Sequence, residues 1–271
     1  MVQDESALQI AYTIVSYTMT SLSIVTKTYN RVAYLMECMQ SVQQLVHAPH
    51  AADFTWEHVI YDDGSTDDTE AYCKSHPASH RRYIRSEQNE GVSKAAINAI
   101  NHCESEWIFE LDSDDIMPQR ALTNWYESTI KYPQADWFIA DFYRTDERLC
   151  YAMGMDYYGW KFADPRAVLA AIFRGEHFIQ HNVFYKRALW RSVGMYRPEL
   201  SMAEDLDLYI RFLLAGRMPV YVPWISHLHR NHLGNLSRNV DGRAHRRDLS
   251  RLAEHYSAAL KKMGVLVAME R

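Results

Sequence analysis

Residues 107–115 read Trp-Ile-Phe-Glu-Leu-Asp-Ser-Asp-Asp, a short apolar run that ends in three aspartates within four positions. The run is too short for a helix, and its aromatic and β-branched side chains are typical of a buried strand. Carboxylates this close repel one another, so they need a nearby cation or full solvation. The pattern predicts a covered strand that delivers Asp112, Asp114 and Asp115 to a sheet edge. The alternative is a solvated turn before a helix that begins at Pro118.

The preceding segments repeat one pattern of strand, polar loop and helix. Residues 22–26, 56–61 and 82–85 are predicted strands, and helical patterns follow through about residue 45, over 67–74 and over 92–103. With the strand at 107–112, this succession predicts an α/β fold with a doubly wound, mostly parallel sheet. Ligands bind outside the carboxyl ends of strands in such sheets, so the acidic ends at Asp62 and Asp112 are predicted to share one site.

After about residue 116 the pattern becomes mixed. Helices are predicted at 118–132, 165–173 and 186–193, strands at 136–143, 178–185 and 220–226, and another helix opens at Ser201. No Pro/Gly/Ser-rich linker separates this half, which is therefore interpreted as a mixed continuation of the same sheet. The expected organisation is an N-terminal extension (1–20), a main domain (21–240) whose two halves are about 21–116 and about 117–240, and a C-terminal amphipathic helix (241–271).

The composition excludes several classes of protein. Hydrophobic residues make up 48% and charged residues 23%, as in ordinary soluble proteins, and the net charge of −5 provides no basic field for nucleic acid. The four cysteines form no Cys-x-x-Cys pair and are expected to be reduced. The N-terminus begins with acidic residues, and no run approaches the ~20 apolar residues of a membrane span. A cytoplasmic protein is expected.

A phosphate-binding glycine loop is also missing from the sequence. No Gly-x-Gly-x-x-Gly follows the first strand, and no Gly-x4-Gly-Lys-Ser/Thr occurs. The phosphates of a bound nucleotide would therefore need another counter-charge. A divalent metal held by Asp112 and Asp114 would supply it, because hard cations prefer carboxylate oxygens.

The helix that opens at Ser201 carries two further acids. Ser201 and Glu204 have the spacing of a capping box, which gives Glu204 a structural explanation. Asp205 has no such explanation. It lies in the first turn, where the helix dipole favours the ionised carboxylate, and it could serve as a general base.

Two features near the C-terminus each leave two interpretations open. His227, His229 and His232 follow the last predicted strand, and they either ligate a metal or lie in a surface loop. The predicted tail helix presents either a solvated basic face or a face that contacts an anionic membrane surface. Its basic residues are Arg243, Arg246, Arg247, Arg251, Lys261 and Lys262.

The order of the segments 23–31, 59–69, 89–98, 111–115 and 204–211 resembles the family 2 glycosyltransferases of the GT-A fold. The resemblance covers roughly residues 20–240. It implies inverting transfer of a sugar from a nucleotide diphosphate sugar, most often a UDP-sugar in this family, to a hydroxyl of a glycan or lipid-linked acceptor. It also implies a Mn²⁺ or Mg²⁺ cofactor.

The resemblance assigns roles to individual positions. Thr26 and Tyr29 would line the nucleotide pocket, although most relatives have proline at the position of Thr26. Asp62 would contact the base, and donor binding is implied for Arg31, Lys94, Asp112 and Ser113. Metal binding is implied for Asp112, Asp114 and His232, with Asp114 the more direct ligand. Asp205 would be the catalytic base, and Glu204 beside it would place the acceptor.

Two rival functions share this fold. A sugar nucleotidyltransferase would carry a glycine-rich phosphate loop after the first strand, whereas residues 26–31 contain no glycine. A non-catalytic sugar-nucleotide-binding relative would be indicated by loss of Asp205, Asp112 or Asp114, and all three are present. The donor sugar and the acceptor stay open. Acceptor binding and core packing are both open roles for the aromatic residues Tyr157, Tyr158, Trp160 and Trp190.

Overall fold

A computed structural model describes residues 20–45, 54–153, 161–174, 176, 179–200, 202–235 and 243–265. The predicted extension before residue 20 and the residues Tyr157, Tyr158 and Trp160 lie outside the described residues.

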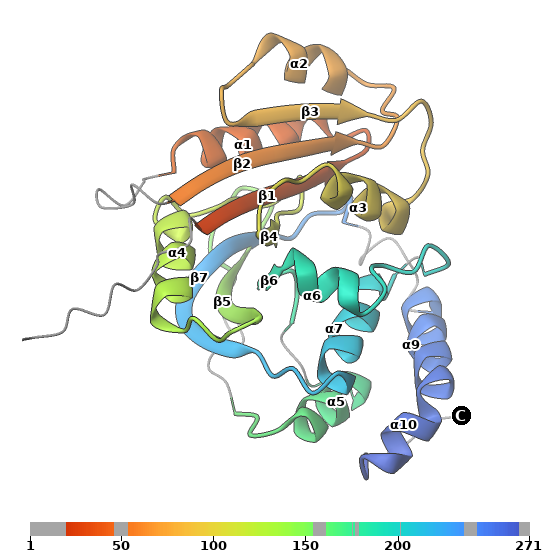
Figure 1. The fold of residues 1–271 in the computed structure, drawn as a ribbon. Helices are drawn as coiled ribbons and strands as arrows, with labels where there is room; N and C mark the ends of the chain where they lie inside the picture. The colour runs from red at the N-terminus through yellow and green to blue at the C-terminus, as the bar shows by residue number, and fades with distance from the viewer. Residues whose placement is uncertain are drawn as a thin grey trace, which may run out of the picture.

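A single sheet runs through the described part of the chain (Figure 1). Its seven strands are ordered β3-β2-β1-β4-β6-β5-β7, and β6 runs antiparallel to its neighbours β4 and β5 while the other pairs are parallel. The predicted α/β class, a mostly parallel sheet with a mixed second half, is confirmed. The strands are β1 (Thr20–Thr28), β2 (Phe54–Asp62), β3 (Arg81–Arg85), β4 (Trp107–Glu110), β5 (Trp137–Thr145), β6 (Val183–Lys186) and β7 (Val220–Arg230).

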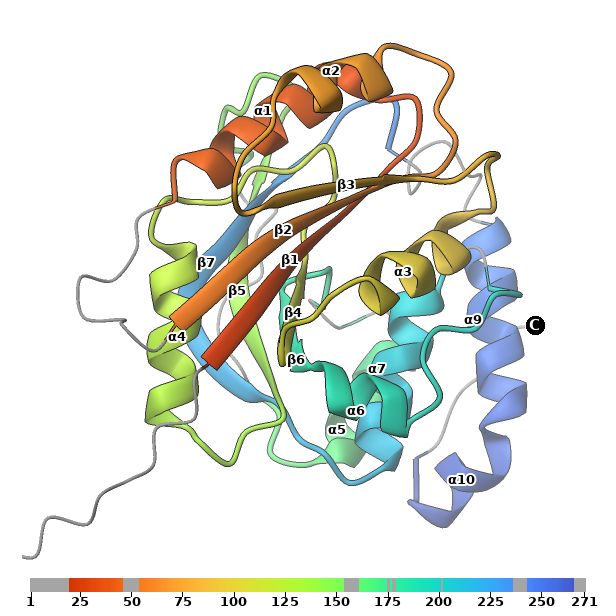
Figure 2. The same cartoon turned by 45° about the horizontal axis from the view of Figure 1, so that its top comes forward.

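Helices cover both faces of this sheet (Figure 2). One face carries α1 (Val32–Gln43), α2 (Thr69–Ser75) and α4 (Ala121–Lys131). The other carries α3 (Val92–Asn101), α5 (Pro165–Arg174), α6 (Arg187–Ser192) and α7 (Glu204–Leu214), with α9 (Arg243–His255) and α10 (Ser257–Lys262) beyond them. None of the helices in the described residues is long and apolar enough to span a membrane.

The double cover explains why the strands lack alternation of apolar and polar residues. Along β1, Leu22 and Ile24 pack in the cluster beneath α1 and α4, whereas Val25 packs in the cluster beneath α3 and α7, and all three are fully buried. A strand covered on both faces can be apolar at consecutive positions, as at Ile24 and Val25, and does not need to alternate.

Several predicted elements have different bounds in the structure. The helix predicted from Pro118 begins at Ala121, and the strand predicted from residue 178 begins at Val183. β7 continues past Ser226 to Arg230, because it keeps pairing with β5 as far as Thr145. The predicted single tail helix is two helices, α9 and α10, with the largely buried Tyr256 between them.

Candidate active site

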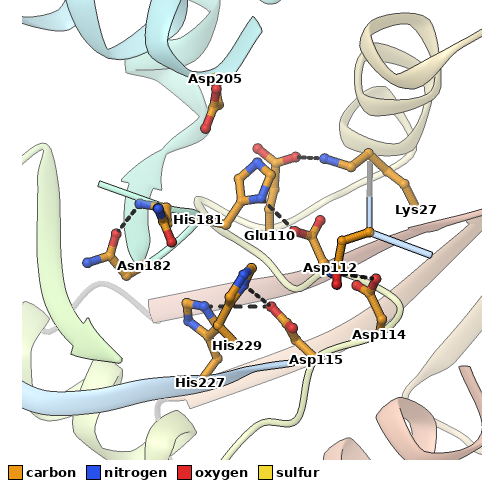
Figure 3. A network of polar contacts seen from close by, with 12 residues as sticks. Lys27, Glu110, Asp112, Asp114, Asp115, His181, Asn182, Asp205, His227 and His229 are labelled. Atoms are coloured by element: carbon orange, nitrogen blue, oxygen red, sulfur yellow. Dashed lines mark hydrogen bonds and ion pairs between the residues drawn. The ribbon is translucent and has the colours of Figure 1, made fainter. Parts of the chain in front are cut away.

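Parallel strands bring the predicted acidic segments to one edge of the sheet. β2 and β4 both flank β1 in parallel, so Asp62 and Asp112 lie at the same edge. The loop after β4 is also held against β7, since Ile116 and Leu228 exchange two backbone hydrogen bonds of 3.2 and 2.8 Å. This bridge brings the aspartates of the loop to the histidines at the end of β7 (Figure 3).

Asp112 pairs with a histidine that the sequence reasoning did not single out. His181 Nδ1 lies 2.9 Å from Asp112 Oδ2, and the side chain of Asp112 keeps 32% of its surface exposed. Burial lowers the pKa of His181, but the adjacent Asp112 carboxylate outweighs this effect and raises the pKa to about 10. His181 is therefore a cation at neutral pH. In return, His181 lowers the pKa of Asp112 against the opposing effect of burial.

No spacing rule points to His181, because its contact with Asp112 joins segments far apart in the chain. The residue has a φ of 54°, in the left-handed region that non-glycine residues seldom adopt. Its Nε2 atom is buried and has no hydrogen-bond partner in the part of the chain that the structure describes.

Asp114 contacts two side chains that the sequence assigned to the same site. Arg31 donates to Asp114 Oδ2 and, through its other terminal nitrogen, to the carbonyl of Gly234 at 2.8 Å. His232 Nε2 lies 2.9 Å from the same carboxylate oxygen. The Gly234 N–H donates to His232 Nδ1 at 3.1 Å, so in this arrangement Nε2 carries the imidazole proton and donates it to Asp114. Metal binding by His232 through Nε2 would require the Gly234 hydrogen bond to break.

Asp115 faces two histidines of β7. Its Oδ2 atom lies 3.6 Å from His227 Nε2 and 3.5 Å from His229 Nδ1, and these three atoms form a group compact enough to hold a metal ion. Burial lowers the pKa of His227 to about 3, so this imidazole is neutral. The reading of these histidines as members of a surface loop was wrong, because His227 and His229 lie on β7 and the side chains of His227 and His232 are buried.

Glu204 and Asp205 begin α7, with Ala203 as the N-cap residue. The predicted capping box was wrong, because it needs Ser201 at the N-cap, and Ser201 itself lies outside the described residues. Asp205 Oδ1 accepts a 2.7 Å hydrogen bond from the Leu206 N–H at the helix start. Burial raises the pKa of Glu204 to about 7, and the neighbouring Asp205 carboxylate adds to the shift.

A buried ion pair lies beneath these groups. Lys27 Nζ is 2.7 Å from Glu110 Oε2, and Tyr185 and Tyr196 both donate hydroxyl hydrogen bonds to Glu110 Oε1. Burial opposes ionisation of both partners, yet each partner's charge outweighs it, so the pKa of Lys27 is raised and that of Glu110 is lowered. The pair fixes the end of β4, from which Asp112 projects.

Two predicted nucleotide-binding side chains are fully buried. Thr26 faces the α1 layer and its hydroxyl hydrogen-bonds to His58 Nε2 at 3.0 Å. Asp62 accepts from the Ser65 N–H at 2.8 Å and from the Tyr83 hydroxyl at 2.6 Å. Neither side chain has exposed surface, and the predicted roles of Thr26 in lining the nucleotide pocket and of Asp62 in contacting the base stay predictions.

The other predicted donor residues are placed differently. Tyr29 is 43% exposed, Lys94 is exposed on α3, and Ser113 is buried in the loop after β4. Tyr29 and Arg31 flank Asn30, whose side-chain oxygen accepts a 2.7 Å hydrogen bond from the Thr66 N–H and so locks the loops after β1 and β2 together. Among the candidate acceptor aromatics, Trp190 is fully buried and packs in the core.

An open cavity of about 650 Å³ lies beside His232. Its volume is within the range of small-molecule sites. Polar side chains dominate its lining, which consists of Asp146, Glu147, Arg148, Asn231, His232 and Leu233.

The sequence profile described as "Glycosyl transferase family 2" matches residues 23–191. The chain belongs to this family. Among its relatives is a chondroitin synthase of Escherichia coli, 28% identical over 198 residues. The match covers 72% of this chain but only 27% of that synthase.

Solved structures share the fold of this family 2 chain. S. aureus TarS 1-349 in complex with UDP-GlcNAc superposes with a TM-score of 0.68 at 17% identity, covering 89% of this chain and 66% of TarS 1-349. The mannosyltransferase PcManGT of Pyrobaculum calidifontis, in complex with GDP-Man and Mn²⁺, gives a TM-score of 0.60 at 16% identity, covering 89% of this chain and 64% of that one. At these identities the likeness concerns the fold alone, which is GT-A.

Proposed function

We propose that the chain is an inverting glycosyltransferase that moves a sugar from a UDP-sugar to a hydroxyl of a glycan or lipid-linked acceptor. Membership of glycosyl transferase family 2 supports the reaction class. The TarS complex with UDP-GlcNAc supports UDP as the nucleotide, and the named chondroitin synthase relative supports a glycan acceptor. In this proposal residues 21–116 bind the donor and residues 117–240 bind the acceptor.

The placement of Asp205 carries the proposal. Asp205 stands at the start of α7 and faces His181 and Asp112 across the carboxyl edge of the sheet (Figure 3). The carboxylates of Asp112 and Asp205 both raise the pKa of His181, so both acids lie close enough to His181 to interact with its charge. Asp112 belongs to the proposed donor side and Asp205 to the proposed acceptor side.

One displacement step accounts for the chemistry. The acceptor oxygen attacks the anomeric carbon, the bond from that carbon to the diphosphate oxygen breaks, and the electron pair leaves with the nucleoside diphosphate. Asp205 takes the acceptor's hydroxyl proton as the new bond forms. A single attack from the face opposite the leaving group inverts the anomeric centre, so no protein nucleophile is needed. Glu204, beside Asp205, would place the acceptor hydroxyl.

The residues around Asp112 and Asp114 fit a hard divalent cation. Asp112 offers a partly exposed carboxylate, and Asp114 lies two residues further along the same loop with His232 next to it. A bound Mn²⁺ or Mg²⁺ would stabilise the negative charge on the departing diphosphate as a Lewis acid. Arg31 already contacts Asp114 and would contribute a fixed positive charge beside the phosphates.

Further donor and membrane contacts belong to the same proposal. Tyr29 would stack on the base, and Lys94 and Ser113 would contact the donor. Exposed Arg246, Arg251 and Lys261 on α9 and α10 would give peripheral contact with an anionic membrane that carries a lipid-linked acceptor.

Calorimetric titration with UDP, GDP and dTDP, each with Mn²⁺ and then with EDTA, tests the donor site. We expect metal-dependent binding of UDP, which Asp114→Ala weakens. Asp205→Asn should bind UDP like the wild type while sugar transfer falls by at least 100-fold, because a positioned base contributes 10²–10⁴-fold. Glu254→Gln, at an exposed position of α9, is the charge-matched control and should keep both properties.

Two outcomes would contradict this assignment. Near-normal transfer by Asp205→Asn would remove Asp205 from the role of base. Metal-dependent UDP binding by a wild-type protein that transfers no sugar to any glycan tested would favour a non-catalytic sugar-nucleotide binder.

A further inference from the structure

We propose that Asp115, His227 and His229 form a second cation site, separate from the Asp112–Asp114 motif, that holds a borderline divalent ion such as Zn²⁺. The inference does not rest on the proposed glycosyl transfer. Two imidazoles and one carboxylate are a common ligand set for zinc and similar first-row metals.

Hydrogen bonding prepares His227 as a metal ligand. Ser226 Oγ donates to the backbone carbonyl of Asp141 at 3.0 Å, which uses the hydroxyl proton. The same oxygen lies 2.9 Å from His227 Nδ1 and must therefore accept a hydrogen bond from the Nδ1–H group. This assigns the neutral imidazole a bare lone pair on Nε2. His227 Nε2 is buried and has no hydrogen-bond partner among the described residues.

The unprotonated Nε2 atom of His227 points at a group that cannot donate a hydrogen bond to it. Its neighbour is the Asp115 carboxylate oxygen, an acceptor, at 3.6 Å (Figure 3). Two lone pairs that face each other in a buried place are unfavourable, and a cation between them would satisfy both. His232 shows the opposite arrangement, because its Nδ1 atom accepts a backbone N–H and its Nε2 atom donates to Asp114.

The distances match the edges of a metal coordination shell. Asp115 Oδ2 lies 3.6 Å from His227 Nε2 and 3.5 Å from His229 Nδ1, too far for strong direct hydrogen bonds. Tetrahedral zinc with bonds of about 2.1 Å separates its ligand atoms by about 3.4 Å. Only small movements are therefore needed to close the three atoms around an ion.

Surrounding groups orient His227 and Asp115, and the strand places His229 beside them. His227 and His229 are two residues apart on β7, so their side chains project from the same face of the strand. Phe142 stacks on the His227 ring at 5.3 Å with an interplanar angle of 6°. The Arg230 N–H donates to Asp115 Oδ1 at 2.8 Å, which leaves Oδ2 free for the ion. Such outer contacts are typical of metal ligands.

The basic partners of the three aspartates in this loop also favour a cation at Asp115. Asp112 already pairs with His181, and Asp114 pairs with Arg31. Asp115 is buried, and its nearest basic groups are the two histidines of the cluster. A bound ion would complete the neutralisation and clamp the loop after β4 to β7, holding Asp114 in register. The partly exposed His229 gives the ion access from solvent.

Metal titration without nucleotide tests the site. Metal-free protein is titrated with Co²⁺ followed by its visible d–d absorption, and bound Zn²⁺ is counted by mass spectrometry after gel filtration. We expect one equivalent per chain in the wild type and in His232→Gln. His229→Gln, at the partly exposed ligand, should bind at least tenfold more weakly.

The proposed site is refuted if the metal-free wild type binds neither Co²⁺ nor Zn²⁺. It is also refuted if His232→Gln loses the ion while His229→Gln keeps it. If the wild type binds neither Co²⁺ nor Zn²⁺, a protonated His229 and not a metal ion compensates the charge of Asp115. Should His229→Gln fail to fold, crystals of the wild type soaked in Zn²⁺ decide by anomalous scattering at the zinc edge. A peak between Asp115, His227 and His229 supports the site, and peaks only elsewhere refute it.

Discussion

Replacing Glu110 by glutamine should destabilise the protein strongly while leaving its shape intact. The side chains of Glu110 and Lys27 are only 2% and 9% exposed and lie 2.7 Å apart. Glutamine keeps the volume of glutamate and can still accept hydrogen bonds from Tyr185 and Tyr196. The substitution therefore removes only the negative charge that compensates Lys27. Leaving a buried charge uncompensated lowers the free energy of unfolding by about 3–5 kcal/mol.

The pH dependence of this loss has a definite sign. Lys27 lowers the pKa of Glu110 below its ordinary value of 4.5. A carboxylate with a lowered pKa stabilises the fold above its ordinary pKa, and that stabilisation is lost as the pH falls through the lowered value. The difference between wild type and Glu110→Gln should be full at pH 7 and shrink below about pH 4.5.

Urea unfolding followed by far-ultraviolet circular dichroism measures the effect. Lys27→Met in the Glu110→Gln background should recover much of the stability, because it removes the stranded cation. Glu70→Gln, which breaks the exposed pair with Lys74, is the matched control and should leave the unfolding midpoint nearly unchanged. A loss below about 1 kcal/mol, or no recovery in the double variant, would refute the reasoning.

Three further substitutions have expected outcomes. Glu204→Gln should be more stable than wild type near pH 8 but not near pH 4, because the raised pKa of Glu204, about 7, makes ionisation costly in the fold; equal unfolding curves at both pH values would contradict this. Thr26→Val should cost about 1–3 kcal/mol in urea unfolding, since His58 loses its buried partner. Gly64→Ala should lower the melting temperature in calorimetry, because φ is +76° and an added Cβ would lie 2.6 Å from the backbone of Gln88; an unchanged melting temperature would be inconsistent with this geometry.

The local pattern of residues 107–115 was enough to predict a buried strand ending in acids, and it was right because apolar runs and clustered charge are properties of neighbours in sequence. The parallel α/β class followed from repetition of the same unit. Roles for Asp112, Asp114 and Asp205 came from their carboxylate chemistry together with the resemblance to a family, and they stay predictions until tested.

Other features depend on segments that meet only in the folded chain. Thr26 was predicted to line the nucleotide pocket, and its side chain is fully buried because α1 covers that face of β1. His181 gains its charge from Asp112, and His227 acquires its buried place because β7 runs on beside β5 to Arg230. The sequence by itself determined the strands and the acidic ends, through propensity and hydrophobic pattern. Tertiary structure alone decided which side chains are desolvated and which charges meet, because burial and Coulomb interactions depend on distance in space and not on separation along the chain.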